Sequence, residues 1–197
     1  MVRAPTENEE LIKKVMGDDY LDLTVTKVIL EDVPDQDESQ VEAFLKSQPG
    51  TVKGKGAGLG GALWCGFLER YASEYESLQS LKLYSFEVKV RPDTKKGQDG
   101  SDAIAEVFLE ICNSEGKRFA FSDASRSMVS STSRAIASSV EYFINAERAF
   151  ITLFKSWQDA KARGRVDLIT RYTSEMAEVV KSTSYAKVIE NIKSEMA

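Results

Sequence analysis

The chain has 197 residues, of which 42% are hydrophobic and 29% are charged, enough for one substantial core or for one domain with a helical appendage. Its net charge of -5 and its pI near 5.0 argue against the clustered Lys and Arg of a nucleic-acid surface. The sequence lacks histidine, which removes the usual general base and the commonest transition-metal ligand. With a polar start and no apolar run of roughly 18 residues, it predicts a cytoplasmic protein without a metal, a cofactor, a membrane partner or a nucleic-acid partner.

The first predicted elements are a short helix and a strand. Residues 7–16 place apolar side chains on one helical face and are followed by Gly17, so residues 1–17 are interpreted as a helical leader. The alternating, β-branched run from Tyr20 to Asp32 predicts a strand. Residues 40–46 are compatible with either a helical turn or a half-buried strand.

A repeated pattern resolves that ambiguity. The segment Val41–Leu45 is echoed by Ala105–Leu109, and the second copy is bounded by hairpin-type turn signals. We therefore predict two copies of one strand-strand-strand-helix unit, at residues 18–77 and 78–145, related by a pseudo-two-fold axis in an α+β fold. The remaining predicted elements are strands at 50–55, 81–91, 104–112 and 117–122 and helices at 59–75 and 128–145.

The chain after Asn145 has the pattern of helices alone. Apolar stripes predict helices at 146–163, 166–182 and 185–196, which together form a helical extension over 146–197. We expect these stripes to pack on the sheet or on each other rather than to serve a dedicated partner.

The segment with possible chemistry is the glycine-rich run 54–62, where a strand meets a helix. Free backbone amides at a helix start can bind a carboxylate or a phosphate, and glycines allow a ligand to approach closely. The spacing matches neither a Walker A motif nor a dinucleotide fingerprint. Alternatively, the glycines only let the helix pack tightly against its sheet.

Three segments over about residues 18–145 resemble a known family, the C-terminal regulatory domain of α-isopropylmalate synthases and citramalate synthases. The first follows a Gly-x-Gly-Asn-Gly-Pro-Val-Asp-Ala pattern through Gly54, Gly56, Gly58 and Ala62, and departs from it at Ala57, Leu59, Gly60 and Gly61. The second matches a family strand through Leu78, Leu81, Leu83 and Val88, with Phe86 in a Tyr position. The third is in register with citramalate-type sequence at Ser125, Val129, Ala135, Ser139, Glu141 and Tyr142, with Ser127 replacing an Asn.

The resemblance implies a regulatory, ligand-binding homodimer of branched-chain amino acid biosynthesis that senses leucine, isoleucine or a related metabolite. The family's catalytic barrel and its His-x-His metal motif are absent here, so we expect no enzymatic activity and no catalytic or metal-ligating residues. Binding of a branched-chain amino acid requires helix N-termini near its carboxylate, a polar acceptor near its ammonium group and an apolar pocket for its side chain.

The resemblance implies a set of ligand-binding residues, assigned by their positions in the matching segments. The amides of residues 56–58 and 123–127 are expected to hold the carboxylate, Asp123 to accept from the ammonium group, and Tyr84 or Phe86 to line the pocket. Asp123 or Ser125 capping the second helix, and Phe86 as ordinary core, are the alternatives. The full predicted set is Gly54, Gly56, Ala57, Gly58, Tyr84, Phe86, Asp123, Ala124, Ser125 and Ser127.

A second function class stays open at this point. The sensor fold can serve as a structural dimerisation or protein-interaction module that has lost ligand sensing. In the sensor interpretation, the chain acts as a separate domain or as a subunit on a synthase. An enzyme that works through carboxylates alone is disfavoured, because no pair of acidic residues is spaced to share a site.

Overall fold

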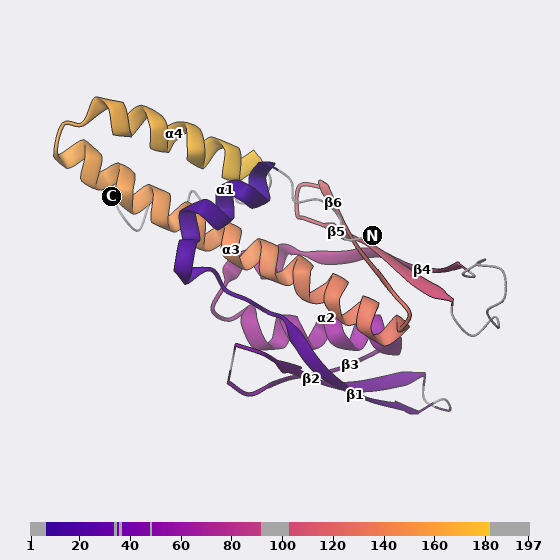
Figure 1. Ribbon diagram of the computed structural model, residues 1–197. Coiled ribbons are helices and arrows are strands. Elements are labelled where there is room, and N and C mark those ends of the chain that lie inside the picture. Colours follow the sequence, from indigo (N-terminus) through magenta and orange to yellow (C-terminus); the bar gives the residue numbers. More distant parts are fainter. Residues whose placement is uncertain (1–6, 34, 36, 48, 92–102, 182–197) are drawn as a thin grey trace.

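A computed structural model describes residues 7–33, 35, 37–47, 49–91 and 103–181 (Figure 1). The fold is α+β, with two three-stranded antiparallel sheets and a helical part at the C-terminal side. The first unit contains β1 (Val25–Val33), β2 (Glu38–Leu45), β3 (Thr51–Gly56) and α2 (Gly58–Tyr71). The second contains β4 (Lys82–Arg91), β5 (Ile104–Cys112), β6 (Arg118–Ser125) and α3 (Met128–Ala162). Helix α1 (Glu7–Met16) precedes both units, α4 (Val166–Lys181) follows them, and short 3-10 helices occupy Gly17–Asp19 and Glu76–Ser80.

The two units repeat the same sheet topology. Sheet A has the order β1-β2-β3 and sheet B the order β4-β5-β6, with every neighbouring pair antiparallel. The echoed segments are the two middle strands, and their corresponding alternate residues are buried: Val41, Ala43 and Leu45 in β2, and Ala105, Val107 and Leu109 in β5. Both strands therefore turn the same face of the repeat toward the core, because side chains alternate between the faces of a strand.

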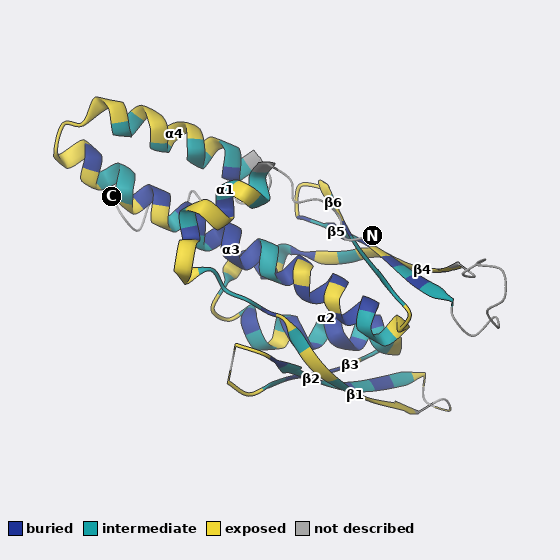
Figure 2. Cartoon of the chain, viewed as in Figure 1, coloured by how far each residue is buried: buried dark blue, intermediate teal, exposed yellow. Residues whose placement is uncertain are grey.

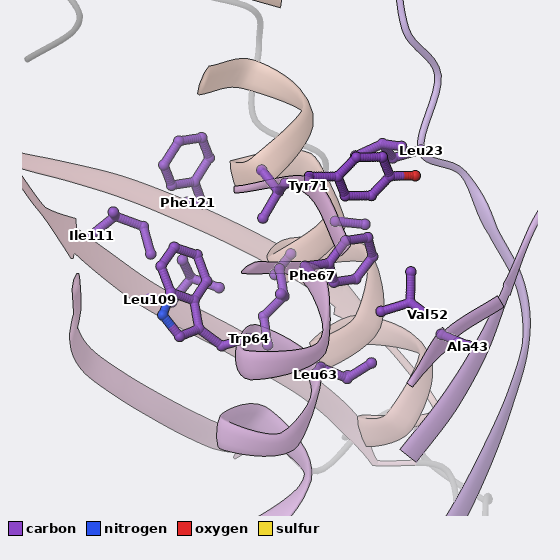
Figure 3. Close-up of a cluster of buried hydrophobic side chains, with 14 of the residues drawn as sticks. Leu23, Ala43, Val52, Leu63, Trp64, Phe67, Tyr71, Leu109, Ile111 and Phe121 are labelled. Atoms are coloured by element: carbon purple, nitrogen blue, oxygen red, sulfur yellow. The ribbon is translucent and has the colours of Figure 1, made fainter. Parts of the chain in front are cut away.

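Helices α2 and α3 lie between the two sheets, and they begin at the same end of the molecule (Figure 1). One hydrophobic cluster joins residues of both sheets and both helices. In Figure 3, α2 presents Trp64 toward Leu109 and Ile111 of sheet B, while Val52 of sheet A lies beyond Phe67 on its other side. Neither unit could bury its apolar face alone, which explains why the pair folds around a shared core.

The glycines of β3 bring α2 very close to sheet A. A Cβ atom built on Gly54 would lie 2.1 Å from the Ala62 carbonyl oxygen, and one on Gly56 would lie 2.8 Å from the Gly61 carbonyl carbon. These are backbone atoms that cannot move aside without shifting the helix. Tight packing of the helix on its sheet therefore requires Gly54 and Gly56.

Helix α3 differs from the predicted pair of helices, because it continues through Asn145 as one helix of 35 residues. Its second half packs with α1 and α4 around a separate cluster. The buried members of this cluster are Ile12, Met16, Ala146, Ala149, Phe150, Leu153, Phe154 and Val179. Helix α1 thus packs with the helical extension, and α3 connects that extension to the shared core.

The segment Tyr20–Thr24 was predicted as the start of a strand, but β1 begins at Val25. The segment is instead bound along α3 by two side chains. Glu141 accepts hydrogen bonds from the Tyr20 hydroxyl (3.0 Å) and the Leu23 amide (2.8 Å). Asn145 accepts from the Leu21 amide (2.8 Å) and donates to the Leu21 carbonyl (2.9 Å). From Tyr20 to Leu23, helix side chains are thus the hydrogen-bond partners of the extended segment, whereas the Thr24 carbonyl accepts from the Lys46 amide at 2.9 Å, directly after β2.

The exposed residues gather on the outer faces of the sheets, on the edge strands and on α4 (Figure 2). Among the described helices, none is both long and apolar enough to cross a membrane. Both cysteines, Cys65 and Cys112, are free thiols. The helix predicted for residues 185–196 falls outside the described residues.

Candidate ligand site

The start of α2 presents backbone amides without a side-chain cap. The N-cap residue is Ala57, which has no side-chain oxygen, and no side-chain capping bond is made there. Gly58 follows with a φ of 65°, a conformation that glycine adopts at little cost, and a Cβ on it would meet no atom within 4 Å. Amides at the beginning of a helix have no partner within the helix and carry partial positive charge. This helix start can therefore accept an anionic group such as a carboxylate.

An aromatic ring lies beside these amides. A Cβ built on Gly60 would lie 3.1 Å from the Phe86 ring, so the ring rests against the first turn of α2. Phe86 remains 38% exposed, although it pairs with Leu109 on the inward face of sheet B. An uncapped helix start next to a partly exposed ring provides both a polar and an apolar contact for a small ligand.

Tyr84 is separated from this site. An irregularity in the β4–β5 register between Leu83 and Ser85 displaces it from the alternation. Its ring stacks against Arg118, whose guanidinium carbon lies 3.8 Å from the ring centroid, and its hydroxyl accepts a hydrogen bond from Arg118 at 2.7 Å. Arg118 also pairs with Glu110, on the outer face of sheet B. Tyr84 and Phe86 therefore lie on opposite faces, although the sequence assigned both to one pocket.

The start of α3 is closed by its own side chains. Ser127 caps the helix by accepting a hydrogen bond from the Ser130 amide at 3.2 Å. The Ser125 hydroxyl accepts from the Ser127 amide at 3.2 Å and lies 2.8 Å from the Ser131 hydroxyl, which donates to the Ala105 carbonyl at 3.2 Å. The cap of this helix is therefore Ser127, and not Asp123 or Ser125 as the alternative predicted, while Ser125 supports the same turn. This helix start offers fewer free amides than that of α2.

Asp123 is held by an arginine of α3. The Arg134 guanidinium donates to both oxygens of this carboxylate, with distances of 2.6 and 3.1 Å. The hydrogen bond to Asp123 raises the pKa of Arg134 above its ordinary value. Asp123 pairs with Val107 and so faces the helices, whereas its neighbour Ala124 pairs with Glu106 on the opposite face. The structure therefore directs Asp123, but not Ala124, toward the interior of the sandwich.

The structure brings together part of the predicted set. Ala57 and Gly58 form the start of α2, Phe86 lies against Gly60 in its first turn, and Gly54 and Gly56 support that start from β3. Sequence reasoning missed Gly60 and Arg134. Gly60 was visible in the glycine run, but only the fold shows that its missing side chain admits an aromatic ring from the other unit. No local spacing signals Arg134, which lies eleven residues after its partner Asp123.

Comparison with known proteins adds no assignment: no protein-family model matches the chain, and no curated protein matches its sequence. Within the described ranges, no group of three or more acidic, cysteine or histidine side chains is arranged to hold a metal ion.

Proposed function

We propose that this protein is a non-catalytic regulatory protein that binds a branched-chain amino acid or a related metabolite as a homodimer. In this it would be similar to the leucine- or isoleucine-sensing domain of isopropylmalate and citramalate synthases. The observation that carries the proposal is the uncapped start of α2 beside the partly exposed ring of Phe86. The repeated unit and the resemblance of residues 18–145 support it.

Each part of such a ligand has an assigned partner. The α2 amides of Gly58, Leu59 and Gly60 bind the carboxylate, because a helix N-terminus stabilises negative charge. The branched side chain contacts Phe86, and burial of about 25 cal/mol per Å² of apolar area favours this contact. Asp123 accepts from the ammonium group, since each carboxylate oxygen has a second lone pair beyond the Arg134 contact.

The proposal includes a cytoplasmic location and action either as a separate regulator or as a subunit on a synthase. A second candidate function is a structural dimerisation module without ligand sensing. The serine-capped start of α3 and the Asp123–Arg134 pair favour that candidate, because polar groups assigned to the ligand already have partners within the chain.

Thermal unfolding with and without amino acids tests the proposal. A ligand that binds only the folded state at about 100 times its Kd adds about 2.7 kcal/mol, which raises Tm by several degrees. We expect a selective shift with leucine, isoleucine or valine. For each variant, the shift is the difference between its Tm with and without the ligand. Phe86→Ala should abolish this shift. Tyr84→Ala should preserve it, because Tyr84 lies on the other face of the sheet.

Two results would contradict the sensor function. One is the absence of a shift with every amino acid and with branched 2-oxo acids. The other is an equal shift in Phe86→Ala and the unchanged protein. A flat screen from a folded dimer would support the structural module.

A further inference from the structure

Strand β4 has an open edge. It is the outermost strand of sheet B and is ten residues long. Within the described part of the chain, β5 is its only strand neighbour, and no other segment makes a backbone hydrogen bond to residues 82–91. Such an edge presents a row of free backbone donors and acceptors that can pair with another strand.

The inward face of this edge carries exposed apolar side chains. Phe86 is 38% exposed and Val90 is 65% exposed, although they pair with the buried residues Leu109 and Ala105 of β5. Val88 lies between them on the same face and is half-buried. The sheet ends at β4, so nothing described covers the outer side of these residues. A further strand beside β4 would cover the outer side of these residues.

The outward face of the same strand carries charges of both signs. Glu87 and Lys89 flank Val88, and their side chains are 59% and 54% exposed. In the single chain they form an ion pair with each other at 3.2 Å, and Lys89 lies over the Phe108 ring. An exposed pair of this kind contributes little to stability and exchanges partners readily.

We propose that β4 pairs antiparallel with β4 of a second copy about a two-fold axis at Val88, joining two copies of sheet B into one six-stranded sheet. In this register Glu87 lies opposite the second copy's Lys89, and Phe86 lies opposite its Val90. Both contacts occur twice, because the interface is isologous. Opposite charges and apolar pairs directly across an antiparallel ladder are stabilising.

The neighbouring registers are unfavourable. An axis at Glu87 places two glutamates directly opposite each other, and an axis at Lys89 does the same with two lysines. Like charges in this position destabilise a strand pair. A shift by a single residue would turn the apolar row to the wrong face of the joined sheet. Of these three axes, only the one at Val88 brings opposite charges together without placing two like charges directly opposite each other.

The equivalent edge strand β1 provides a comparison. Its outward face also carries opposite charges, at Lys27 and Glu31, around the exposed Ile29. Helix α3 packs along β1, however, and Val129, Ser130 and Arg134 of its first turns line a groove beside residues 25–28. Strand β4 is the more open of the two edges, and β1 supplies matched control substitutions.

This inference rests on the proposed function only for the expectation of a dimer. It makes no use of the ligand. Ligand binding measured on the same samples separates the two proposals, because retained binding by a protein that does not pair through β4 overturns the interface alone.

Sedimentation equilibrium of the full chain tests the interface. Glu87→Lys and Lys89→Glu each convert two opposite-charge pairs into two like-charge pairs, so each should raise the dimer Kd on the order of tenfold or more. An equimolar mixture of the two variants should recover a heterodimer, since the two lysines of one variant strand then face the two glutamates of the other. Val90→Lys, at a site exposed enough to preserve folding, should also weaken the dimer.

The controls are Lys27→Glu and Glu31→Lys, which make the same charge changes on β1 and should leave the dimer Kd unchanged. Circular dichroism verifies that each variant is folded. The inference is overturned if the unchanged protein is a monomer at millimolar concentration. It is also overturned if the β4 variants keep the original Kd, or if the β1 variants show the weakening and the recovery on mixing.

Discussion

Glu141 is a half-buried residue whose carboxylate connects an extended segment to α3. It accepts hydrogen bonds from the Tyr20 hydroxyl and the Leu23 amide. Burial, the largest influence, raises the pKa of Glu141 above its ordinary value, and the hydrogen bonds oppose this rise only in part. The folded protein therefore binds this proton more tightly than the unfolded chain does. The stabilising effect is fully present below the unfolded pKa and is lost as the pH rises through the folded pKa.

Substituting Glu141→Gln should remove this pH dependence. The amide keeps an acceptor for the Leu23 amide and a donor for the Tyr20 oxygen, but it has no charge to bury. We expect similar unfolding free energies for variant and unchanged protein near pH 4, and an advantage for the variant that grows toward pH 7. Urea unfolding across this range measures it, with Glu69→Gln on the exposed side of α2 as a control. An advantage for the variant that is the same at every pH would contradict the account.

Gly54 and Gly61 make opposite predictions for the same chemical change. A Cβ on Gly54 would lie 2.1 Å from a backbone oxygen of α2, so Gly54→Ala should destabilise the protein by about 1–3 kcal/mol or more. A Cβ on Gly61 would have only one neighbour, at 3.9 Å, and alanine is the better helix former. Gly61→Ala should therefore stabilise by about 0.5–1 kcal/mol. Denaturant unfolding measures both effects, and a Gly54→Ala variant as stable as the unchanged protein would refute the packing role of Gly54.

At the scale of elements, the strands were the most predictable part of the chain. Alternation placed the strand at 104–112 with the same bounds as β5, and the strand at 81–91 within one residue of β4. Buried residues alternate with less buried ones in β5, and apolar side chains alternate along β4, so the period of two is visible in the sequence. The predicted break at Asn145 was wrong, because its side chain bonds to the distant residue Leu21 and leaves the helix backbone intact.

The continuity of α3 gives Asn145 a structural role that can be measured. Its side chain satisfies both the amide and the carbonyl of Leu21 and is fully buried. Asn145→Ala leaves these backbone groups without partners, and we expect a loss of about 1–3 kcal/mol. Ser138→Ala, at an exposed position of the same helix, is the control and should change stability by no more than about 0.5 kcal/mol. Equal unfolding free energies for the two variants would exclude the proposed fastening of Leu21 to α3.

At the scale of the whole molecule, the repeat in the sequence anticipated the architecture. The echoed segments Val41–Leu45 and Ala105–Leu109 occupy equivalent middle strands and turn equivalent residues inward. The arrangement of both helices between the sheets was not readable, because it depends on contacts between units. One example is Gly60 of the first unit against Phe86 of the second.

In the candidate site, features set by neighbouring residues were predictable from the sequence, whereas features set by contacts between distant residues were not. The glycine run correctly marked the start of α2, but two of its members, Gly54 and Gly56, are needed for packing. The irregularity at Tyr84 separated two aromatic residues that simple alternation places on one face. No sequence signal predicts that irregularity, since it arises from the pairing of β4 with β5.

An amide NMR titration of the folded protein with leucine, isoleucine and valine tests ligand binding at the start of α2 directly. We expect saturable shifts of the resonances of Gly58, Leu59 and Gly60, because their amides receive the ligand carboxylate. We expect smaller shifts for the serine-capped start of α3. Unchanged spectra with all three ligands, or shifts confined to the helical extension, would contradict amino-acid binding at the start of α2.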